Sequence, residues 1–429
     1  MTQWTAMTPT LPRAGLAALA LLGTLLTGCS SGSDPAPAAG GPATTTASGS
    51  APTPSIDPAT PTGWGPTEGE LATARTLVAS LSLEQRASTV LMPGFWGYDA
   101  EHPSAAEALR NQEMHGVDTA DEALSAHHFG GVFLRPEVIA DADQVHRLTD
   151  DLHHVGDVPD GLPLLISIDQ EGGVVQRLKD GVALVPSAES VGQRDDPAYA
   201  RQVALDNGRT LRRLGVTMVM APVADVDPMG VSVMGSRTYS PDRKVAAQMV
   251  TTTVKAYLRA GVVPVVKHFP GLGSVSGDSH HALPEQHKSL GQLQRSDLVT
   301  FRAAIAAGAP VVMTAHLGVD AIDPGVPGSI SEGVVTGLLR HTLGFQGVAV
   351  TDSQGMGPIN GPFNSSEGAV RSLIAGDDLV LNSPYPGRAR HGVVQAVRAG
   401  RLPASRLAEA ATRVLALRMF QQRIASGAR

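Results

Sequence analysis

Charged side chains and histidines follow five consecutive apolar runs of this chain, at or soon after the point where each run ends. They are Asp169, Arg177, Arg237, Lys267, His268, Asp278, His280, His316 and Asp352. A single charged residue at the end of a strand is often a cap or an ion pair. Because so many groups at corresponding positions are hard to explain by capping alone, we interpret them as one reactive site. Two kinds of hydrolytic chemistry suit these side chains.

The first is metal-assisted hydrolysis, since His268, Asp278, His280 and His316 are reasonable metal ligands. Barrel hydrolases of that kind generally carry His-x-His at the end of their first strand. Here that region reads Met92-Pro93-Gly94-Phe95-Trp96 and offers no ligand. We therefore expect neither a metal nor another cofactor.

The second is hydrolysis of a glycosidic bond. This reaction needs one carboxylate that attacks the anomeric carbon and one acid that protonates the leaving oxygen. It also needs charged groups that hydrogen-bond the hydroxyls of the sugar. The mixture of Asp, Arg, Lys and His supplies all of these groups.

Eight short apolar runs, rich in β-branched residues, must position these groups. They read as continuously apolar rather than alternating, which is typical of strands buried on both faces. The runs cover residues 89–92, 131–134, 164–168, 218–223, 263–266, 311–314, 348–351 and 379–382.

Helical patterns separate the apolar runs. Apolar residues recur at a spacing near 3.6 in 200–214 and 244–260, and Ser82 to Gln85 has the form of a capping box. Two further helices, 391–399 and 404–424, follow the last strand. Eight strand-then-helix units predict an α/β protein with a single (β/α)8 TIM-type barrel over residues 67–429. In such a barrel the reactive groups gather at the carboxyl ends of the strands.

Composition restricts the partners of the chain. Its net charge is −7, from 33 Lys and Arg against 40 Asp and Glu. Nucleic-acid binders need a basic face, so we expect no nucleic acid as partner. Cys29 is the sole cysteine, so no disulfide can form within the chain. We expect a monomer.

The first residues have the pattern of an export signal. Arg13 precedes a short apolar run that ends in Leu26-Thr27-Gly28-Cys29, and the run is too short to span a membrane. The Leu-Thr-Gly-Cys ending resembles the bacterial lipobox, in which the cysteine is lipidated. We thus expect a lipoprotein signal peptide over residues 1–28 and a lipid anchor at Cys29. Residues 29–66, rich in Ser, Pro, Ala, Gly and Thr, are expected to form a disordered tether. The protein would then be exported and held at the outer face of the cell membrane.

Three motifs resemble family 3 glycoside hydrolases. They are Ile168-Asp169-Gln170-Glu171-Gly172-Gly173 with Gln176-Arg177, Lys267-His268-Phe269-Pro270-Gly271-x-Gly273, and Asp278-Ser279-His280 with Pro284. The spacing of the last two is similar to the bacterial β-N-acetylhexosaminidase branch of that family. The β-glucosidase branch lacks the Asp-x-His insertion and usually places Trp after the nucleophile, where this chain has Ser353.

The resemblance implies a role for each matching residue. Asp352 corresponds to the nucleophile and His280 to the acid/base, with Asp278 as its partner. The positions that hold the N-acetylglucosamine ring correspond to Asp169, Arg177, Arg237, Lys267 and His268, and His316 matches a motif near the site. A carboxylate beside a histidine sets its tautomer and stabilises the imidazolium.

The same resemblance implies a retaining exo-β-N-acetylglucosaminidase acting on N-acetylglucosamine-containing glycan fragments of the cell wall. The alternatives are a family 3 β-glucosidase or β-xylosidase, and an inactive anchored sugar-binding lipoprotein. Leu272 replaces the usual His between the two glycines, and Ser353-Gln354-Gly355 is atypical after the nucleophile. The sequence leaves open the leaving group and the choice between water and phosphate as acceptor.

Overall fold

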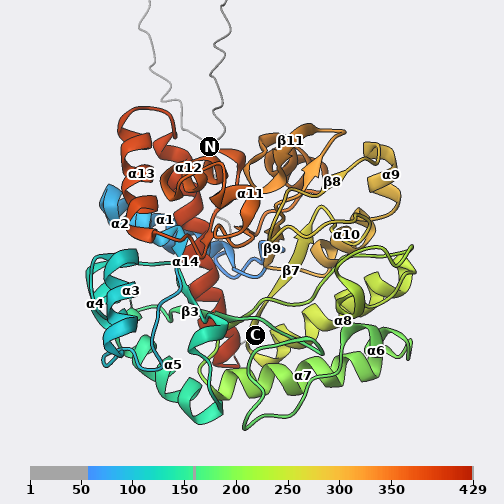
Figure 1. Ribbon diagram of the computed structural model, residues 1–429, viewed down its shortest axis with the longest axis horizontal. Helices are drawn as coiled ribbons and strands as arrows, with labels where there is room; N and C mark the ends of the chain where they lie inside the picture. The colour runs from blue at the N-terminus through green and yellow to red at the C-terminus, as the bar shows by residue number, and fades with distance from the viewer. Residues whose placement is uncertain (1–56, 158–160, 428–429) are drawn as a thin grey trace, which may run out of the picture. The chain divides into compact units, whose positions relative to one another are not determined.

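The computed structural model describes residues 57–157 and 161–427, in which strands and helices alternate along the chain (Figure 1). The expected signal peptide, Cys29 and most of the expected tether lie outside the described residues. The strands are β1 (Leu91–Met92), β2 (Gly131–Phe133), β3 (Leu165–Ile168), β4 (Gln170–Gly172), β5 (Val175–Gln176), β6 (Met218–Val219), β7 (Val263–Phe269), β8 (Glu285–Gln286), β9 (Val311–Thr314), β10 (Gly318–Val319), β11 (Asp323–Pro327), β12 (Val348–Thr351) and β13 (Val380–Leu381).

The helices begin with a pair that precedes β1 and end with a pair that follows β13. They are α1 (Glu68–Ser80), α2 (Leu83–Thr89), α3 (Ala105–His115), α4 (Ala120–Ala126), α5 (Ala142–Gly156), α6 (Ala188–Gly192), α7 (Pro197–Arg213), α8 (Arg243–Ala260), α9 (Leu290–Arg295), α10 (Leu298–Ala306), α11 (Gly357–Asn360), α12 (Ser365–Ala375), α13 (Pro386–Arg398) and α14 (Ala404–Ala425), with a π-helix η4 (Gly333–Thr342) and short 3₁₀ turns η1 (Pro136–Val138), η2 (Gly235–Arg237) and η3 (Gly328–Ile330). Among these described helices, none is both long and apolar enough to cross a bilayer.

All eight predicted strands are present, six in a curled parallel sheet and two as a separate parallel pair. Six of them pair in the order β12-β9-β7-β6-β3-β2, and β1 pairs with β13. The backbone N–H of Phe133 donates to the Pro93 carbonyl (2.8 Å) between β2 and β1, and Val350 pairs with Leu379 between β12 and β13. Every residue of β3, β7, β9 and β12 is buried, which explains why these strands do not alternate. The α/β class of the prediction is confirmed.

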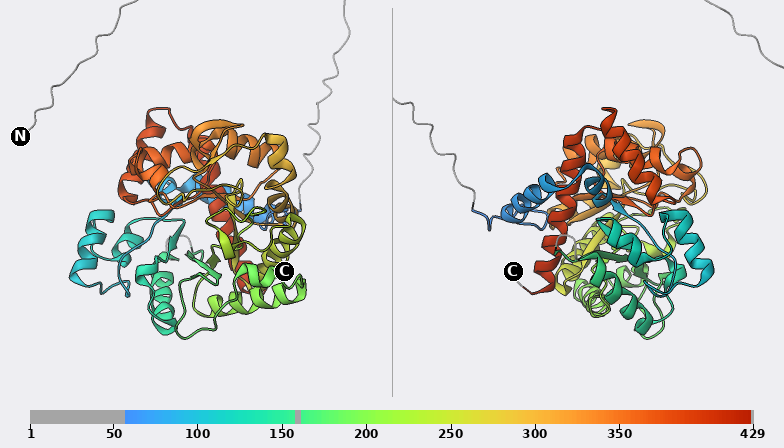
Figure 2. Two further views of the ribbon diagram at one scale, coloured as in Figure 1. Left: turned by 45° about the vertical axis from the view of Figure 1, so that its right-hand side comes forward. Right: turned by 90° about the vertical axis from the view of Figure 1, so that its left-hand side faces the viewer.

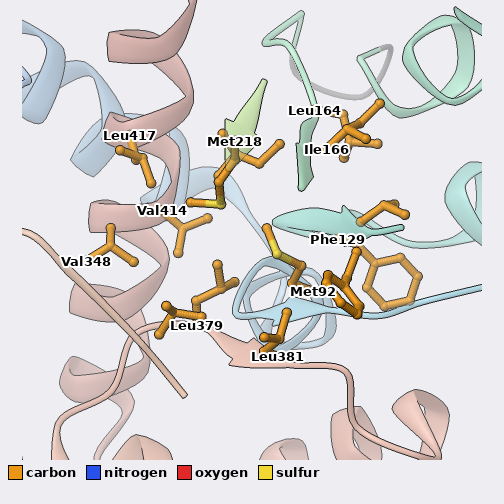
Figure 3. Packing of buried hydrophobic residues seen from close by; sticks show 14 of the residues in the cluster. Met92, Phe129, Leu164, Ile166, Met218, Val348, Leu379, Leu381, Val414 and Leu417 are labelled. Atoms are coloured by element: carbon orange, nitrogen blue, oxygen red, sulfur yellow. The ribbon is translucent and has the colours of Figure 1, made fainter. Parts of the chain in front are cut away.

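Helix α14 covers the amino ends of the strands. Figure 3 shows Val414 and Leu417 on the side of α14 that faces Met218, Val348 and Leu379, and all five side chains belong to one buried apolar cluster. This packing fills one end of the sheet with aliphatic side chains. The carboxyl ends of the strands, where the polar residues of the sequence lie, are at the other end.

The folded part begins before residue 67, where the sequence analysis placed its start. Trp64 is buried in the apolar cluster, and Thr67 caps α1 through a complete capping box with Glu70. Glu70 also pairs with Arg423 of α14 at 2.8 Å, and α1 lies beside α14 (Figure 2). The last ten residues before 67 are therefore an ordered part of the domain, because a large aromatic side chain anchors them.

A buried carboxylate ties the last helix to the sheet. Asp378 precedes β13 and accepts from Arg340 of η4 (2.5 Å), and from Arg406 (2.6 Å) and Arg413 (3.1 Å) of α14. It also accepts from the backbone N–H of Ala349 in β12 at 3.1 Å. Burial alone would raise the pKa of Asp378, but the three guanidinium groups hold it far below its usual range.

Replacing Asp378 with Asn should therefore destabilise the fold strongly. Loss of one partner from a buried ion pair costs about 3–5 kcal/mol, because the remaining charges stay uncompensated. Denaturant unfolding of D378N should show a loss of this size. The matched control is Glu367→Gln, since Glu367 pairs with Arg371 and Arg401 at the surface and should cost under about 1 kcal/mol. Equal losses in the two variants would contradict this account of Asp378.

Candidate active site

Eight of the nine sequence-predicted site residues line one pocket of about 330 Å³ at the carboxyl ends of the strands. They are Asp169, Arg177, Arg237, Lys267, His268, Asp278, His280 and Asp352. His316 is the exception, because its side chain is fully buried. The parallel strands thus bring together residues that are up to 183 positions apart in the chain (352 − 169 = 183).

A network of four charged side chains forms one wall of the pocket. Lys267, at the end of β7, lies 2.8 Å from Asp169 and 2.7 Å from Glu171. Arg237 binds Glu171 in a bidentate manner, with Nε and Nη2 at 2.9 and 2.8 Å from the two carboxylate oxygens. The Lys267 and Glu171 side chains are 4% and 5% exposed. Such buried charges need partners, and each of these has two within the network or the pocket wall.

The network keeps its members ionised. Burial alone would raise the pKa of Glu171, but Lys267 and Arg237 outweigh it and lower the pKa to about 2. Burial works to lower the pKa of Lys267, yet Asp169 and Glu171 hold it above its usual value. The pocket wall therefore offers a fixed ammonium, a guanidinium and carboxylates, which suit the hydroxyl groups of a sugar.

His268 is oriented by Asp225, at the end of the run that forms β6. The ring Nδ1 lies 2.7 Å from one oxygen of Asp225, and the other oxygen accepts from the backbone N–H of Leu272 at 2.7 Å. The Leu272 side chain is buried in a small apolar cluster with Met234 and Val275. Leu272, which stands where the family usually has His, thus still makes the backbone hydrogen bond to Asp225.

Asp352 lines the pocket and comes directly after β12. One of its oxygens accepts from the backbone N–H of Ser353 at 2.8 Å. Burial alone would raise the pKa of Asp352, but His268, the Ser353 N–H and Lys267 outweigh it and hold the pKa below its usual value. Asp352 is therefore a carboxylate with a fixed direction, as a nucleophile requires.

Asp278 and His280 form a hydrogen-bonded pair at the rim of the pocket. The ring Nδ1 and the backbone N–H of His280 lie 2.7 and 2.9 Å from the same Asp278 oxygen. These two bonds from His280 lower the pKa of Asp278, so the carboxylate stays ionised beside the ring. Because Nδ1 faces Asp278, Nε2 is the nitrogen left to exchange a proton with a substrate.

A backbone contact holds this loop against the loop after β12. The N–H of Gly357 donates to the His280 carbonyl at 3.2 Å. A Cβ atom at Gly357 would lie 2.6 Å from the carbonyl oxygen of His281, so a glycine is needed there. His280 and Asp352 are thus carried by loops that contact each other.

His316 lies behind Asp352 rather than in the pocket. Its Nε2 donates to the Ser353 carbonyl (2.9 Å), and its Nδ1 accepts from the Ser329 hydroxyl (2.7 Å). Burial lowers the pKa of His316, which fits this neutral tautomer. We assign His316 the role of a positioning residue that fixes the backbone next to Asp352.

Two residues that touch the site were missed as site residues in the sequence. Glu171 follows Asp169 at a spacing of two, which places both side chains on one face of an extended segment, and this signal could have identified it. Asp225 ends an apolar run and could have been included on the same ground as Asp352.

The residues weighed as metal ligands do not converge on one point. Within the described part of the chain, ligand atoms of three or more His, Cys, Asp or Glu residues lie within 4.8 Å of one another only at Glu285, His287 and Asp320. None of these three lines the pocket. His268 and His316 instead use their ring nitrogens in the hydrogen bonds given above.

Comparison with known proteins identifies the family of the chain. The family model described as "Glycosyl hydrolase family 3 N terminal domain" matches residues 74–417. The chain belongs to glycosyl hydrolase family 3. The resemblance found in the three motifs is thereby confirmed, and the protein is a glycoside hydrolase of this family.

The family 3 relatives with high similarity are named as β-hexosaminidases. "Beta-hexosaminidase" from Methylobacillus flagellatus is 34% identical over 61% of this chain and 75% of its own length. "Beta-hexosaminidase LpqI" from Mycobacterium tuberculosis is 35% identical over 60% of this chain and 68% of its own length.

Solved structures that are similar to this chain include enzymes with related names. A family 3 β-N-acetylglucosaminidase from Paenibacillus sp. str. FPU-7 matches with a TM-score of 0.73 and 36% identity over 80% of this chain. This chain spans 63% of that longer protein. A β-N-acetylhexosaminidase from Beutenbergia cavernae matches with a TM-score of 0.69 and 30% identity, over 80% of this chain and 99% of its own.

The pKa of Glu171 predicts a pH-dependent stability. Because the folded pKa is depressed, the stabilisation by Glu171 is fully present above the pKa of the unfolded chain and is lost as the pH falls toward 2. The difference in free energy of unfolding between wild type and Glu171→Gln should shrink by about 2 kcal/mol from pH 6 to pH 3. Urea unfolding at the two pH values measures it. For the control Glu84→Gln, which removes a surface pair with Arg398, the difference should stay flat, and a flat Glu171→Gln difference would refute the prediction.

Proposed function

We propose that this protein is a retaining, exo-acting β-N-acetylglucosaminidase. One observation carries the proposal: the pocket joins a half-buried carboxylate, Asp352, to a rim histidine, His280, that is paired with Asp278. Membership of family 3 and the β-hexosaminidase names of the relatives support it. The pocket volume suits one sugar ring rather than a chain, which supports action at the end of a glycan.

In the first step Asp352 attacks the anomeric carbon and forms a covalent glycosyl-enzyme. His280 gives the proton on Nε2 to the glycosidic oxygen as the bond breaks. The carboxylate of Asp278, held on Nδ1, stabilises the imidazolium before this transfer and keeps the tautomer correct. Lys267 and Arg237 hold the ring by its hydroxyl groups while the bond breaks.

In the second step the neutral His280 takes a proton from water. As it loses this proton, the water attacks the anomeric carbon and releases Asp352, so that the product keeps the β configuration. This use of one group as acid and then as base explains why the pair lies at the rim, where the leaving group departs and water enters.

We further infer that the eight strands act as one complete barrel. The bonds between β1 and β2 and the bridge between β12 and β13 join the six-stranded sheet to the β1–β13 pair on both sides. Closure would fix the loops after β12, β13, β1 and β2 next to one another around the site.

A pair of chromogenic glycosides tests the activity. The 4-nitrophenyl N-acetyl-β-glucosaminide should be hydrolysed with a kcat/KM about 100-fold or more above that of the β-glucoside, because a site built to bind a polar substituent discriminates against its absence. A preference for the glucoside or xyloside would overturn the substrate assignment. Binding of N-acetylglucosamine without hydrolysis of any of these glycosides would indicate a sugar-binding protein instead.

Replacing His280 with Ala tests its role as acid/base. General acid–base catalysis typically contributes about 10²–10⁴-fold, so H280A should lose kcat to this extent with ordinary glycosides. The loss in the glycosylation step should be much smaller with a 2,4-dinitrophenyl leaving group, which departs unprotonated. Azide should restore part of the deglycosylation rate.

His281→Ala provides the matched control, because the His281 side chain is 84% exposed and lies 3.9 Å from Asp278. It should keep wild-type dependence on the leaving group. If H280A cleaves good and poor leaving groups with the wild-type ratio, His280 is not the acid.

We also propose that the protein is exported and lipid-anchored at Cys29, where it would meet cell-wall fragments outside the membrane. The proposal rests on the apolar run of residues 14–26 and on the single cysteine that follows it. Cys29→Ala should move the protein from the detergent phase to the aqueous phase or block its processing. Unchanged partitioning into detergent would refute the anchor.

A further inference from the structure

The loop that carries His280, which we define as residues 274–284 and call the His280 loop, ends close to where it begins. Its first end, Ser274, lies in a turn after β7, and its second end leads into β8. The second end is held by a neighbouring strand, because the backbone N–H of Gly318 in β10 donates to the Pro284 carbonyl at 2.9 Å. The His280 side chain between the two ends is 66% exposed. Its position therefore depends on the backbone that carries it.

One buried carboxylate, Asp297, binds both ends of the His280 loop. Asp297 directly precedes α10 and is 1% exposed. Its Oδ1 accepts from the hydroxyl of Ser274 at the first end. Its Oδ2 accepts from the ammonium group of Lys288, two residues after β8, at 2.7 Å. The two oxygens of a single carboxylate thus join the two ends of the loop.

Gln286 of β8 completes this connection. Its Nε2 donates to the Ser274 hydroxyl oxygen at 2.9 Å, and its Oε1 accepts from the backbone N–H of Lys288 at 3.1 Å. The Ser274 hydroxyl therefore donates to Asp297 and accepts from Gln286, which uses both capacities of a hydroxyl group. Because the hydrogen bonds of such a network strengthen one another, the two ends are held in one arrangement.

Asp297 is itself fixed by the protein around it. The hydroxyl of the preceding Ser296 donates to its Oδ2. The Thr300 hydroxyl, one turn further along α10, donates to the Ala224 carbonyl at 2.6 Å and so attaches this helix to the run that follows β6. A Cβ atom at Gly271 would lie 2.8 Å from the Cβ of Asp297, and the backbone φ of this glycine is +125°. Glycine therefore allows the turn after β7 to pack directly against the carboxylate.

We propose that Asp297 is a positioning residue for the acid/base His280. This proposal rests on the proposed β-N-acetylglucosaminidase activity. Asp297 sets the separation of the loop ends, and with it the direction in which His280 presents Nε2 to the leaving group. Asp297 does not line the sugar pocket, so it acts through the loop alone. Misplacement of a reacting group by about 1 Å can cost about 100-fold in rate.

A positioning role and a role in stability alone predict different kinetics. Loss of stability reduces the amount of folded enzyme and lowers the rates of all substrates in proportion. A displaced acid instead lowers the rates of substrates whose leaving group needs a proton and leaves the others nearly unchanged. The ratio of kcat/KM for the phenyl and 2,4-dinitrophenyl N-acetyl-β-glucosaminides therefore distinguishes the two roles, since both values report the glycosylation step.

Two serine variants at the same carboxylate form a matched pair. Ser274→Ala removes the hydrogen bond between the first end of the loop and Asp297. Ser296→Ala also removes one hydroxyl from Asp297, but it leaves both ends of the loop attached. Both serines are half-buried. The pair thus separates the attachment of the loop from the number of hydrogen bonds that Asp297 accepts.

Ser274→Ala should lower kcat/KM for the phenyl glycoside about 10-fold and that for the dinitrophenyl glycoside by less than about 2-fold. Asp297→Asn also weakens the contact with Lys288, so it should lower the phenyl value by about 10- to 100-fold with the same selectivity. Ser296→Ala should keep the wild-type ratio. If Asp297→Asn does not fold, the comparison of the two serine variants still decides.

The outcomes separate this proposal from the proposed function. If the wild type hydrolyses neither glycoside, the proposed function fails and the positioning role fails with it. If the wild type is active but Ser274→Ala lowers both values equally, or neither, Asp297 does not position His280 while the activity stands. If Ser296→Ala changes the ratio as much as Ser274→Ala does, attachment of the loop is not the cause, and the proposal is also overturned.

Discussion

The arrangement of the pocket depends on the buried ion pairs that Lys267 makes with Asp169 and Glu171. These pairs fix the end of β7 to the end of β3, and Arg237 extends them to the loop after β6. Well-packed apolar residues in place of a buried ion pair are often equally or more stabilising, so stability alone does not account for them. Their effect is to keep four charged side chains in one wall of a pocket, in fixed directions. Such preorganised charges bind hydroxyl groups without the cost of reorganisation at the moment of reaction.

The backbone beside Asp352 is also held in place by hydrogen bonds. The charged network and Asp352 line the same pocket, and Asp352 accepts from the Ser353 N–H. Ser353 also connects neighbouring elements, because its carbonyl accepts from His316 and its hydroxyl accepts from Asn382. Ser353, the atypical residue after Asp352, therefore has a structural role: its two oxygens join the backbone beside Asp352 to these two side chains.

The sequence predicted the eight strands because buried parallel strands are apolar at every position, and it placed eight of the nine chosen side chains in one pocket because parallel strands end at one edge. The position of His316 could not be predicted, since its burial depends on Ser329 and Ser353, contacts that only the fold brings together. The contacts of Trp96 were equally hidden, because the two guanidinium groups that stack on its ring come from α3 and from the loop after β2. The start of the domain was placed too late because Trp64 stands within a stretch of small and polar residues. Burial of this one aromatic side chain is enough to order the stretch despite its composition.

The central claim is that Asp352 forms a covalent bond to the sugar and that the configuration is retained. A 5-fluoro-N-acetylglucosaminyl fluoride should be turned over slowly enough for the intermediate to accumulate, because fluorine disfavours the positive charge that develops in both steps. Mass spectrometry of the proteolysed protein should find the fluorosugar on Asp352, and NMR of the hydrolysis of an ordinary β-glycoside should show the β-anomer first. A label on another residue, or initial release of the α-anomer, would contradict the account.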